Sequence, residues 1–113
     1  MEQISMGKHL ILEMYDVNFE LLNTLESLLQ SMTLNIELAN MTILNIFHHR
    51  FNPQGLTILF ALAESHVSIH TFPEKGSLTA DAYTCGDGNP EIIINGLIDY
   101  FKSNNYKIRE FAR

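Results

Sequence analysis

Residues 61–76 read ALAESHVSIHTFPEKG. From His66 to His70 polar and apolar side chains alternate, which is the period of a half-buried β-strand. Pro73 and Gly76 then indicate a turn, because proline presets one turn dihedral and glycine accepts a positive φ. The stretch therefore predicts a strand that runs into a turn. A glutamate, two serines and two histidines stand in it where apolar residues would make a simpler core.

The segments on both sides of this stretch predict further strands. Before it, residues 41–51 and 56–63 are rich in β-branched and aromatic residues, and the NPQG segment between them suits a tight hairpin connection. After it, LTADAYTC predicts a partner strand that follows the PEKGS turn. Residues 8–15 alternate in the same way near the start of the chain, and NNYKIREFAR predicts an edge strand at its end.

Two segments have the period of amphipathic helices instead. Leucine, methionine and isoleucine recur at helical spacing from residue 19 to about residue 37, and Asn18 can cap that helix. A second helix begins after GDGNP, with Asn89 as the cap and Pro90 at the first helical position. Its apolar side carries residues 92, 93, 97, 98 and 101.

This order of elements predicts one α+β domain over residues 1–113, in which two main helices cover one face of an antiparallel sheet. The strands at 41–51 and 56–63 are apolar on both sides, so the other face of the sheet also needs cover. A second copy of the chain would supply that cover, and we therefore expect a symmetric homodimer.

Composition excludes several functional classes. The 113 residues are 46% hydrophobic and 18% charged, which suits a single domain with its own core. A net charge of −6 with only 7 Lys+Arg disfavours nucleic acid as a partner, because such binding depends on clustered cations. No apolar run approaches the roughly 20 residues that span a bilayer, and no signal-peptide pattern precedes the first strand. We expect a cytoplasmic protein with no membrane partner.

The histidines do not predict a metal site. His66 and His70 share one face of their strand, but about 13 Å of strand separates them, too far for both to bind one ion. His48 and His49 are adjacent, so they point to opposite faces. A serine hydrolase is also disfavoured, since the Gly-x-Ser-x-Gly elbow is absent from the sequence.

A Glu64–Ser65 bond followed closely by histidines permits self-cleavage. The serine hydroxyl can attack the carbonyl of the preceding residue to form an ester, which a base then eliminates by removing the Ser65 α-proton. Hydrolysis of the resulting dehydroalanine leaves a pyruvoyl group, a ketone that can form a Schiff base with an amine and act as an electron sink. Residue chemistry alone permits this interpretation without selecting it. Cys85, the single cysteine, is either a packed apolar group or a reactive thiol.

Four segments resemble the small prokaryotic S-adenosylmethionine decarboxylase proenzymes: GKHLILEMY, FHHRFNPQG, AESHVSIHTFPEKG and DAYTCGD. They occur in the order and spacing of that family, from Gly7 to the end of the chain. The resemblance implies autocatalytic cleavage between Glu64 and Ser65 into a β chain of residues 1–64 and an α chain of residues 65–113. Ser65 would then become the covalent pyruvoyl cofactor, without a metal. The family is homodimeric, with active sites at the subunit interface, and its product serves spermidine synthesis.

The resemblance also implies roles for individual residues. His70 matches the histidine that assists processing, with a role as the base for the Ser65 α-proton, and Cys85 matches the thiol that protonates the substrate carbon. Phe51 matches the aromatic ring that stacks on adenine, and Glu74 the carboxylate that binds the ribose hydroxyls. Thr57 stands where the family usually has a serine that supports processing. It keeps the hydroxyl, while its extra methyl group stiffens χ1.

Two alternatives to S-adenosylmethionine decarboxylation stay open at this point. A pyruvoyl enzyme could instead decarboxylate another amino acid, such as arginine or ornithine, because the cofactor chemistry is shared. The chain could also be a paralogue that no longer cleaves and acts as a regulatory subunit. Phe51 and Glu74 favour the nucleoside substrate, whereas Ser65, His70 and Cys85 favour an enzyme that cleaves itself. The role of His66 is left open between a core histidine and a site residue.

Overall fold

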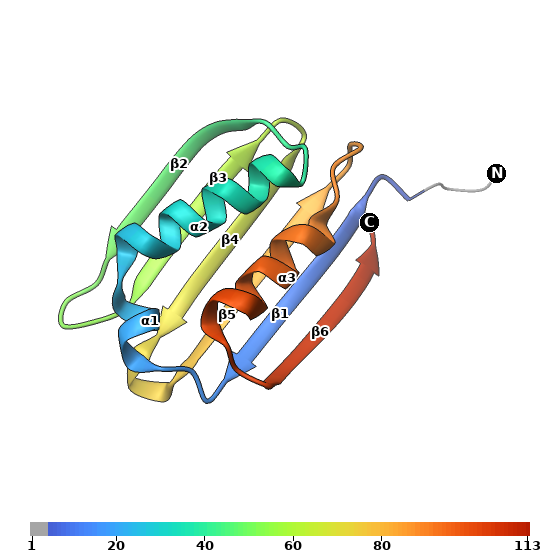
Figure 1. Cartoon of the computed structure of the whole chain (residues 1–113). Helices are drawn as coiled ribbons and strands as arrows, with labels where there is room; N and C mark the ends of the chain where they lie inside the picture. Colours follow the sequence, from blue (N-terminus) through green and yellow to red (C-terminus); the bar gives the residue numbers. More distant parts are fainter. Residues whose placement is uncertain (1–4) are drawn as a thin grey trace.

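The helices lie on one face of a single antiparallel sheet in the computed structural model, which describes residues 5–113 (Figure 1). The six strands stand in the order β2-β3-β4-β5-β1-β6. Their bounds are β1 Lys8–Tyr15, β2 Ile43–Arg50, β3 Leu56–Leu62, β4 Ser65–Phe72, β5 Ser77–Thr84 and β6 Asn105–Ala112. The helices are α1 Phe19–Asn23, α2 Leu25–Leu38 and α3 Pro90–Phe101, with a short 3-10 turn at Pro73–Lys75. The α+β prediction is confirmed.

Alternation along the strands and helical spacing along α2 and α3 build the core between the two layers. In β1, the side chains of Leu10, Leu12 and Met14 are buried against the helices. The helices bury a complementary set of apolar side chains: Leu28, Met32 and Ile36 from α2, and Ile93, Ile94, Leu97 and Phe101 from α3. Burial of this apolar surface is the main favourable contribution to folding. Among residues 5–113, none of the helices has the length and apolar character needed to cross a bilayer.

The continuous helix expected over residues 19–37 is wrong, because the chain breaks it at Thr24. That residue has φ −107° and ψ 103°, an extended conformation that separates α1 from α2. Its hydroxyl donates to the carbonyl of Glu20 at 2.7 Å, a local bond of the kind by which threonine competes with helical hydrogen bonding. The predicted caps are confirmed. The Asn18 side chain accepts from the amide of Glu20 at 2.8 Å, and the Asn89 side chain accepts from that of Glu91 at 3.1 Å.

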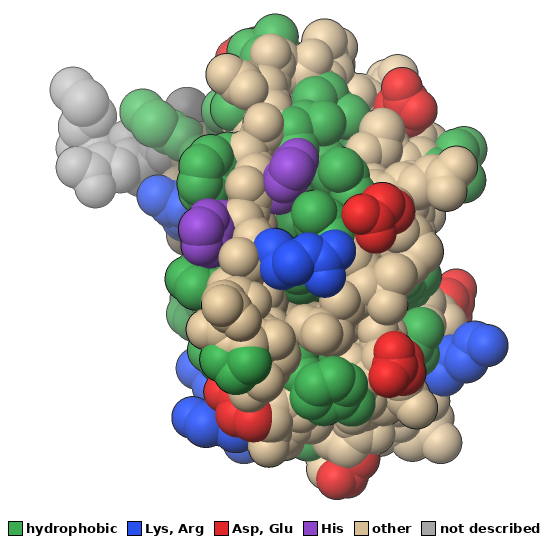
Figure 2. Space-filling model, turned by 90° about the vertical axis from the view of Figure 1, so that its left-hand side faces the viewer, with side chains coloured by type: hydrophobic (Ala, Val, Ile, Leu, Met, Phe, Trp, Pro, Cys, Tyr) green, Lys and Arg blue, Asp and Glu red, His purple; other side chains and the backbone are tan. Residues whose placement is uncertain are grey.

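The sheet face opposite the helices, here called the open face, is not covered by any of the described elements. One cross-strand row on this face shows its mixed character: Arg109, Ile11, Asp81, Ser68, Leu59 and Phe47. Phe47 is 56% exposed and Leu59 41% exposed, although both are large apolar residues on regular strands. At the β2 side of the molecule, hydrophobic side chains and histidines lie at the surface among charged groups (Figure 2). Large apolar side chains are thus exposed on the open face, and its cover by a second subunit remains a prediction.

Candidate functional site

The bond expected to be cut lies in the tight turn between β3 and β4. Leu62 pairs with Ser65, so the turn contains only Ala63 and Glu64. Glu64 has φ 62°, in the left-handed region that glycine adopts easily and other residues adopt at a cost. Such a conformation stores on the order of 1–3 kcal/mol. The backbone strain therefore lies directly before the Glu64–Ser65 bond.

Two consecutive residues at the end of β5 contact the two groups that would react. The Ser65 hydroxyl donates to Oγ1 of Thr84 at 3.2 Å, and the Gly86 amide donates to the same oxygen at 3.1 Å. The exposed Cys85 thiol donates to the carbonyl oxygen of Glu64. The predicted residues Ser65 and Cys85 thus meet at the peptide bond that is expected to be cut. Thr84, which sequence reasoning missed, belongs with them, and these four residues are called the cleavage group: Glu64, Ser65, Thr84 and Cys85.

Four other predicted residues line one pocket at the opposite end of the β3–β4 hairpin. Thr57 and His70 are directly opposite in register, with 2.9 Å between Thr57 Oγ1 and His70 Nδ1. Phe51 and Glu74 complete this set, which is called the pocket group: Phe51, Thr57, His70 and Glu74. The pocket measures about 340 Å³, within the usual range for small-molecule sites. The ring of His49 packs edge-on against Phe51, with 4.5 Å between ring centroids.

The cleavage group and the pocket group do not meet within one chain. Ser65 is the first residue of β4, and His70 lies five positions along the same strand. At about 3.3 Å per residue, this separates their Cα atoms by roughly 16 Å. His70 of the same chain therefore cannot reach the α-proton of Ser65. If His70 is the base, it must act on the Ser65 of another copy.

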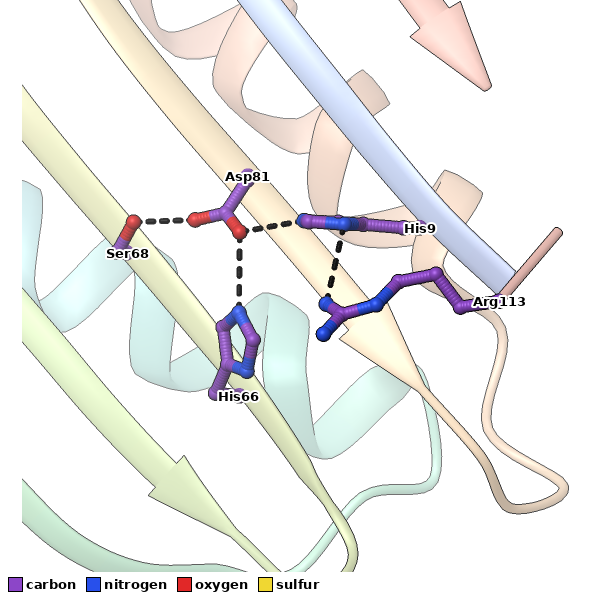
Figure 3. Close-up of polar contacts among 5 residues, drawn as sticks. All are labelled: His9, His66, Ser68, Asp81 and Arg113. Atoms are coloured by element: carbon purple, nitrogen blue, oxygen red, sulfur yellow. Dashed lines mark hydrogen bonds and ion pairs between the residues drawn. The ribbon is translucent and has the colours of Figure 1, made fainter. Parts of the chain in front are cut away.

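A third polar cluster, on the open face, was not found by sequence reasoning (Figure 3). Asp81 lies at its centre, 2.6 Å from Nε2 of His9 and 3.0 Å from Nε2 of His66, and it also accepts a hydrogen bond from Ser68. Burial alone would raise the pKa of Asp81, but the hydrogen bonds from Ser68, His9 and His66 outweigh it and hold this pKa below its usual value. Arg113 donates to Nδ1 of His9 at 3.3 Å on the far side of the ring.

These side chains offer a possible metal-binding set, since ligand atoms of His9, His66 and Asp81 lie within 4.8 Å of one another. The geometry fits hydrogen bonding better. Two ligand atoms bound to one tetrahedral zinc ion lie about 3.3 Å apart, whereas Nε2 of His9 and Oδ2 of Asp81 are 2.6 Å apart. The guanidinium of Arg113 can only donate, so Nδ1 of His9 accepts this hydrogen bond. Nε2 of His9 therefore carries the ring proton and donates it in a hydrogen bond to Asp81. Sequence reasoning paired His66 only with His70, because it could not place β1 beside β5.

Comparisons with known proteins identify the family and the fold. Residues 8–113 match the family model described as S-adenosylmethionine decarboxylase. The chain is 45% identical over 108 residues to the S-adenosylmethionine decarboxylase proenzyme of Synechococcus sp. strain WH7803, covering 95% of this chain and 84% of that relative. It is 38% identical over 114 residues to the proenzyme of that name from Brevibacillus brevis, covering 100% and 86%. The crystal structure of the adenosylmethionine decarboxylase from Aquifex aeolicus superposes with a TM-score of 0.88 at 27% identity, covering 98% of this chain and 92% of that one.

Proposed function

This chain belongs to the S-adenosylmethionine decarboxylase family, and we propose that it cuts its own Glu64–Ser65 bond and then decarboxylates S-adenosylmethionine with the pyruvoyl group left from Ser65. The observation that carries this proposal is the strained turn. There the Ser65 hydroxyl donates to Thr84 at the end of β5, and the Glu64 carbonyl oxygen accepts from Cys85, the next residue. The decarboxylated product would supply aminopropyl groups for spermidine synthesis.

The first step of the cut, formation of the ester, uses groups that lie next to one another in one chain. Oγ of Ser65 attacks the carbonyl carbon of Glu64, the C–N bond breaks, and the hydroxyl proton ends on the amine that Ser65 gains. The Cys85 thiol donates to the carbonyl oxygen, where negative charge develops during the attack. The left-handed conformation of Glu64 favours the step, because the turn can relax once the peptide bond is broken. A base then removes the Ser65 α-proton, and the ester is eliminated with the new main-chain carboxylate of Glu64 as the leaving group. Hydrolysis of the dehydroalanine that remains at position 65 releases ammonia and leaves the pyruvoyl group.

The remaining residues suit the decarboxylation itself. Once formed, the pyruvoyl group supplies an electron sink for the charge that the departing CO₂ leaves on the substrate carbon. Cys85 is exposed at the same end of the sheet, so its thiol can deliver a proton to that carbon. In the pocket group, the exposed ring of Phe51 offers a flat apolar surface for adenine, and Glu74 offers a carboxylate that accepts hydrogen bonds from ribose hydroxyls.

We propose that each complete site combines the cleavage group of one chain with the pocket group of a second copy. The separation of roughly 16 Å along β4 supports this, because one chain cannot join the two groups. The open face supplies the contact surface, since sheets pack face to face through such side chains and Phe47 and Leu59 are exposed on it. A two-fold axis would form two equivalent sites, each pairing one Ser65 with the partner's pocket group.

Intact mass under denaturing conditions tests the cut. We expect two fragments that divide the chain between Glu64 and Ser65, with the second fragment carrying a pyruvoyl amino terminus. A single full-length mass that persists on prolonged incubation would contradict the proposal and favour a regulatory subunit that does not cleave itself. Release of CO₂ from carboxyl-labelled S-adenosylmethionine, compared with arginine and ornithine at equal concentration, then tests the choice of substrate.

Mixing two inactive variants tests the shared site. Ser65→Ala lacks the nucleophile, whereas His70→Ala keeps the nucleophile and lacks the proposed base. When the two chains are co-expressed with tags of different size, a mixed dimer contains one site with both residues intact. We expect only the His70→Ala chain to be cut, and only when the Ser65→Ala chain is present. If mixing restores no cleavage, then the two groups do not come from different copies.

A further inference from the structure

We propose that Thr84 is a positioning residue for the self-cleavage step: its hydroxyl holds Oγ of Ser65 in the orientation that attacks the Glu64 carbonyl. This assignment rests on the proposed function, since it has meaning only if the Glu64–Ser65 bond is cut. It adds to the cleavage chemistry a residue that touches the nucleophile within the same chain.

The register of the sheet places Thr84 directly opposite Ser65 on the neighbouring strand. Thr84 is 5% exposed, so its hydroxyl is shielded from water and bonds to protein groups. Its oxygen accepts two hydrogen bonds, one from the Ser65 hydroxyl at 3.2 Å and one from the Gly86 amide at 3.1 Å. The main-chain donor at Gly86 fixes the Thr84 hydroxyl, and Thr84 in turn fixes the Ser65 hydroxyl.

This arrangement limits the freedom of the nucleophile. An unbonded serine hydroxyl samples three χ1 rotamers, whereas a hydrogen bond to a fixed acceptor selects one of them. Because the Ser65 O–H points at Thr84, the lone pairs on Oγ are free to face the carbonyl carbon. Threonine is too weak a base to take the proton, so its contribution is orientation, which alone can supply a large part of an intramolecular rate.

The next residue along the chain holds the other reacting group. Cys85 donates to the carbonyl oxygen of Glu64, while Thr84 accepts from Ser65. Thr84 and Cys85 therefore contact the two reacting groups separately, one at the hydroxyl and the other at the carbonyl oxygen on which negative charge develops.

The test compares Thr84→Val with Thr84→Ser in the full-length proenzyme. Valine keeps the shape of threonine and removes its hydroxyl, whereas serine keeps the hydroxyl and removes the methyl group. We expect Thr84→Val to be cut about tenfold more slowly than wild type, as the loss of one orienting hydrogen bond implies, and Thr84→Ser to be cut at close to the wild-type rate. Thr84→Ala supplies a second variant without the hydroxyl if the valine variant does not fold.

Two further measurements separate positioning from a general effect on the fold. Ser103→Ala is the matched control, because Ser103 has a similarly buried hydroxyl that bonds to main-chain groups, near Tyr15 at the far end of β1. It should lose thermal stability without slower cleavage. Hydroxylamine splits esters, so the uncut fraction of Thr84→Val should resist it if the defect precedes ester formation.

The outcomes are distinct. If wild type and Thr84→Val are cut at equal rates, or the valine variant faster, the assignment to Thr84 is wrong while the proposed function stands. If hydroxylamine splits the uncut valine variant, Thr84 acts after ester formation and the positioning role is also wrong. If wild type itself is never cut, both proposals are wrong.

Discussion

The Ser65 side chain is both the nucleophile of the proposed cut and the source of the proposed cofactor. We predict that Ser65→Ala leaves one full-length chain with no decarboxylase activity, because alanine has no oxygen to attack the Glu64 carbonyl. Intact mass and CO₂ release measure the two effects. Cleavage at the same bond in this variant would exclude the serine mechanism. The substitution removes only a hydroxyl at a partly buried position, so the variant should keep its fold and serve as the uncut reference.

Asp81 should make the stability of the protein depend on pH. Its folded pKa lies below the unfolded value of 3.8, although burial alone would raise it, because Ser68, His9 and His66 donate to the carboxylate. The charged form is therefore favoured by folding, and this stabilisation is complete above pH 3.8 and disappears as the pH falls through the lower folded pKa.

We predict that Asp81→Asn lowers the free energy of unfolding by about 1–2 kcal/mol at pH 7, because a neutral amide binds these donors less strongly than a carboxylate does. The difference from wild type should shrink as the pH drops below about 3.8. Urea unfolding of both proteins at pH 7, 5, 4 and 3 measures it. A difference that stays constant down to pH 3 would mean that Asp81 does not titrate in this range. Glu20→Gln, on the exposed first turn of α1, is a carboxylate control without this network.

The β3–β4 turn holds Glu64 at a positive φ next to the bond that is expected to be cut. We predict that Glu64→Gly stabilises the uncut Ser65→Ala chain by roughly 0.5–1 kcal/mol, because glycine adopts φ 62° without the steric cost that other residues meet. In a chain that retains Ser65, the same substitution should slow cleavage, since less strain is released.

Glu64→Ala is the matched control for this turn. It removes the carboxylate and keeps a Cβ, so the backbone cost at φ 62° remains. Thermal unfolding of both variants in the Ser65→Ala background measures stability, and the appearance of fragments with Ser65 present measures cleavage. Equal stability of the glycine and alanine variants would show that the turn stores no strain. Unchanged cleavage in the glycine variant would show that strain does not drive the reaction.

The arrangement of the whole molecule separates the cleavage group from the pocket group, and none of the described elements covers the open face. We predict that Leu59→Glu on this face converts a dimer to a monomer and abolishes cleavage, because a charge buried between two sheets lacks a partner. Leu34→Glu on the outer side of α2 is the matched control, since Leu34 is 57% exposed on the covered side of the sheet and should leave both properties intact. Sedimentation and intact mass measure the outcome.

A monomeric wild type that still cleaves itself would contradict this prediction. The cross-strand row that contains Leu59 also contains Ser68 of β4 and Asp81 of β5. Along β4, this row crosses between Ser65 and His70. If the Ser65 end of β4 in one copy lies against the His70 end of β4 in the other, the two-fold axis passes near that row. The Asp81 network of each copy then lies inside the interface. Substitution of Asp81 should then weaken the dimer as well as the fold.

Local patterns in the sequence were sufficient for most of the elements. Period-two alternation predicted β1 and β4, the NPQG and PEKGS segments predicted the β2–β3 and β4–β5 hairpins, and Asn18, Asn89 and Pro90 predicted where two helices begin. The β3–β4 turn at Ala63 and Glu64 was not predicted, because neither residue is typical of turns. These signals depend on neighbouring residues, whose interactions persist whatever the rest of the fold is. The break at Thr24 escaped prediction because apolar residues keep their helical spacing on both sides of it, and only the backbone shows the extended residue between α1 and α2.

The candidate site also combines features that the sequence indicates with contacts that only the fold creates. The sequence by itself indicated the proposed reactive bond, because the Glu64–Ser65 pair with Cys85 twenty residues later is a motif that can be recognised without a fold. Only the tertiary structure decided which of these residues meet. The sheet order brings β1 beside β5 and so joins His9 to Asp81, and the register brings Thr84 to Ser65. It also holds His70 roughly 16 Å from Ser65 of the same chain, because a strand is rigid and extended. The contact between His9 and Asp81 joins two strands that no turn connects, and no local pattern encodes that pairing.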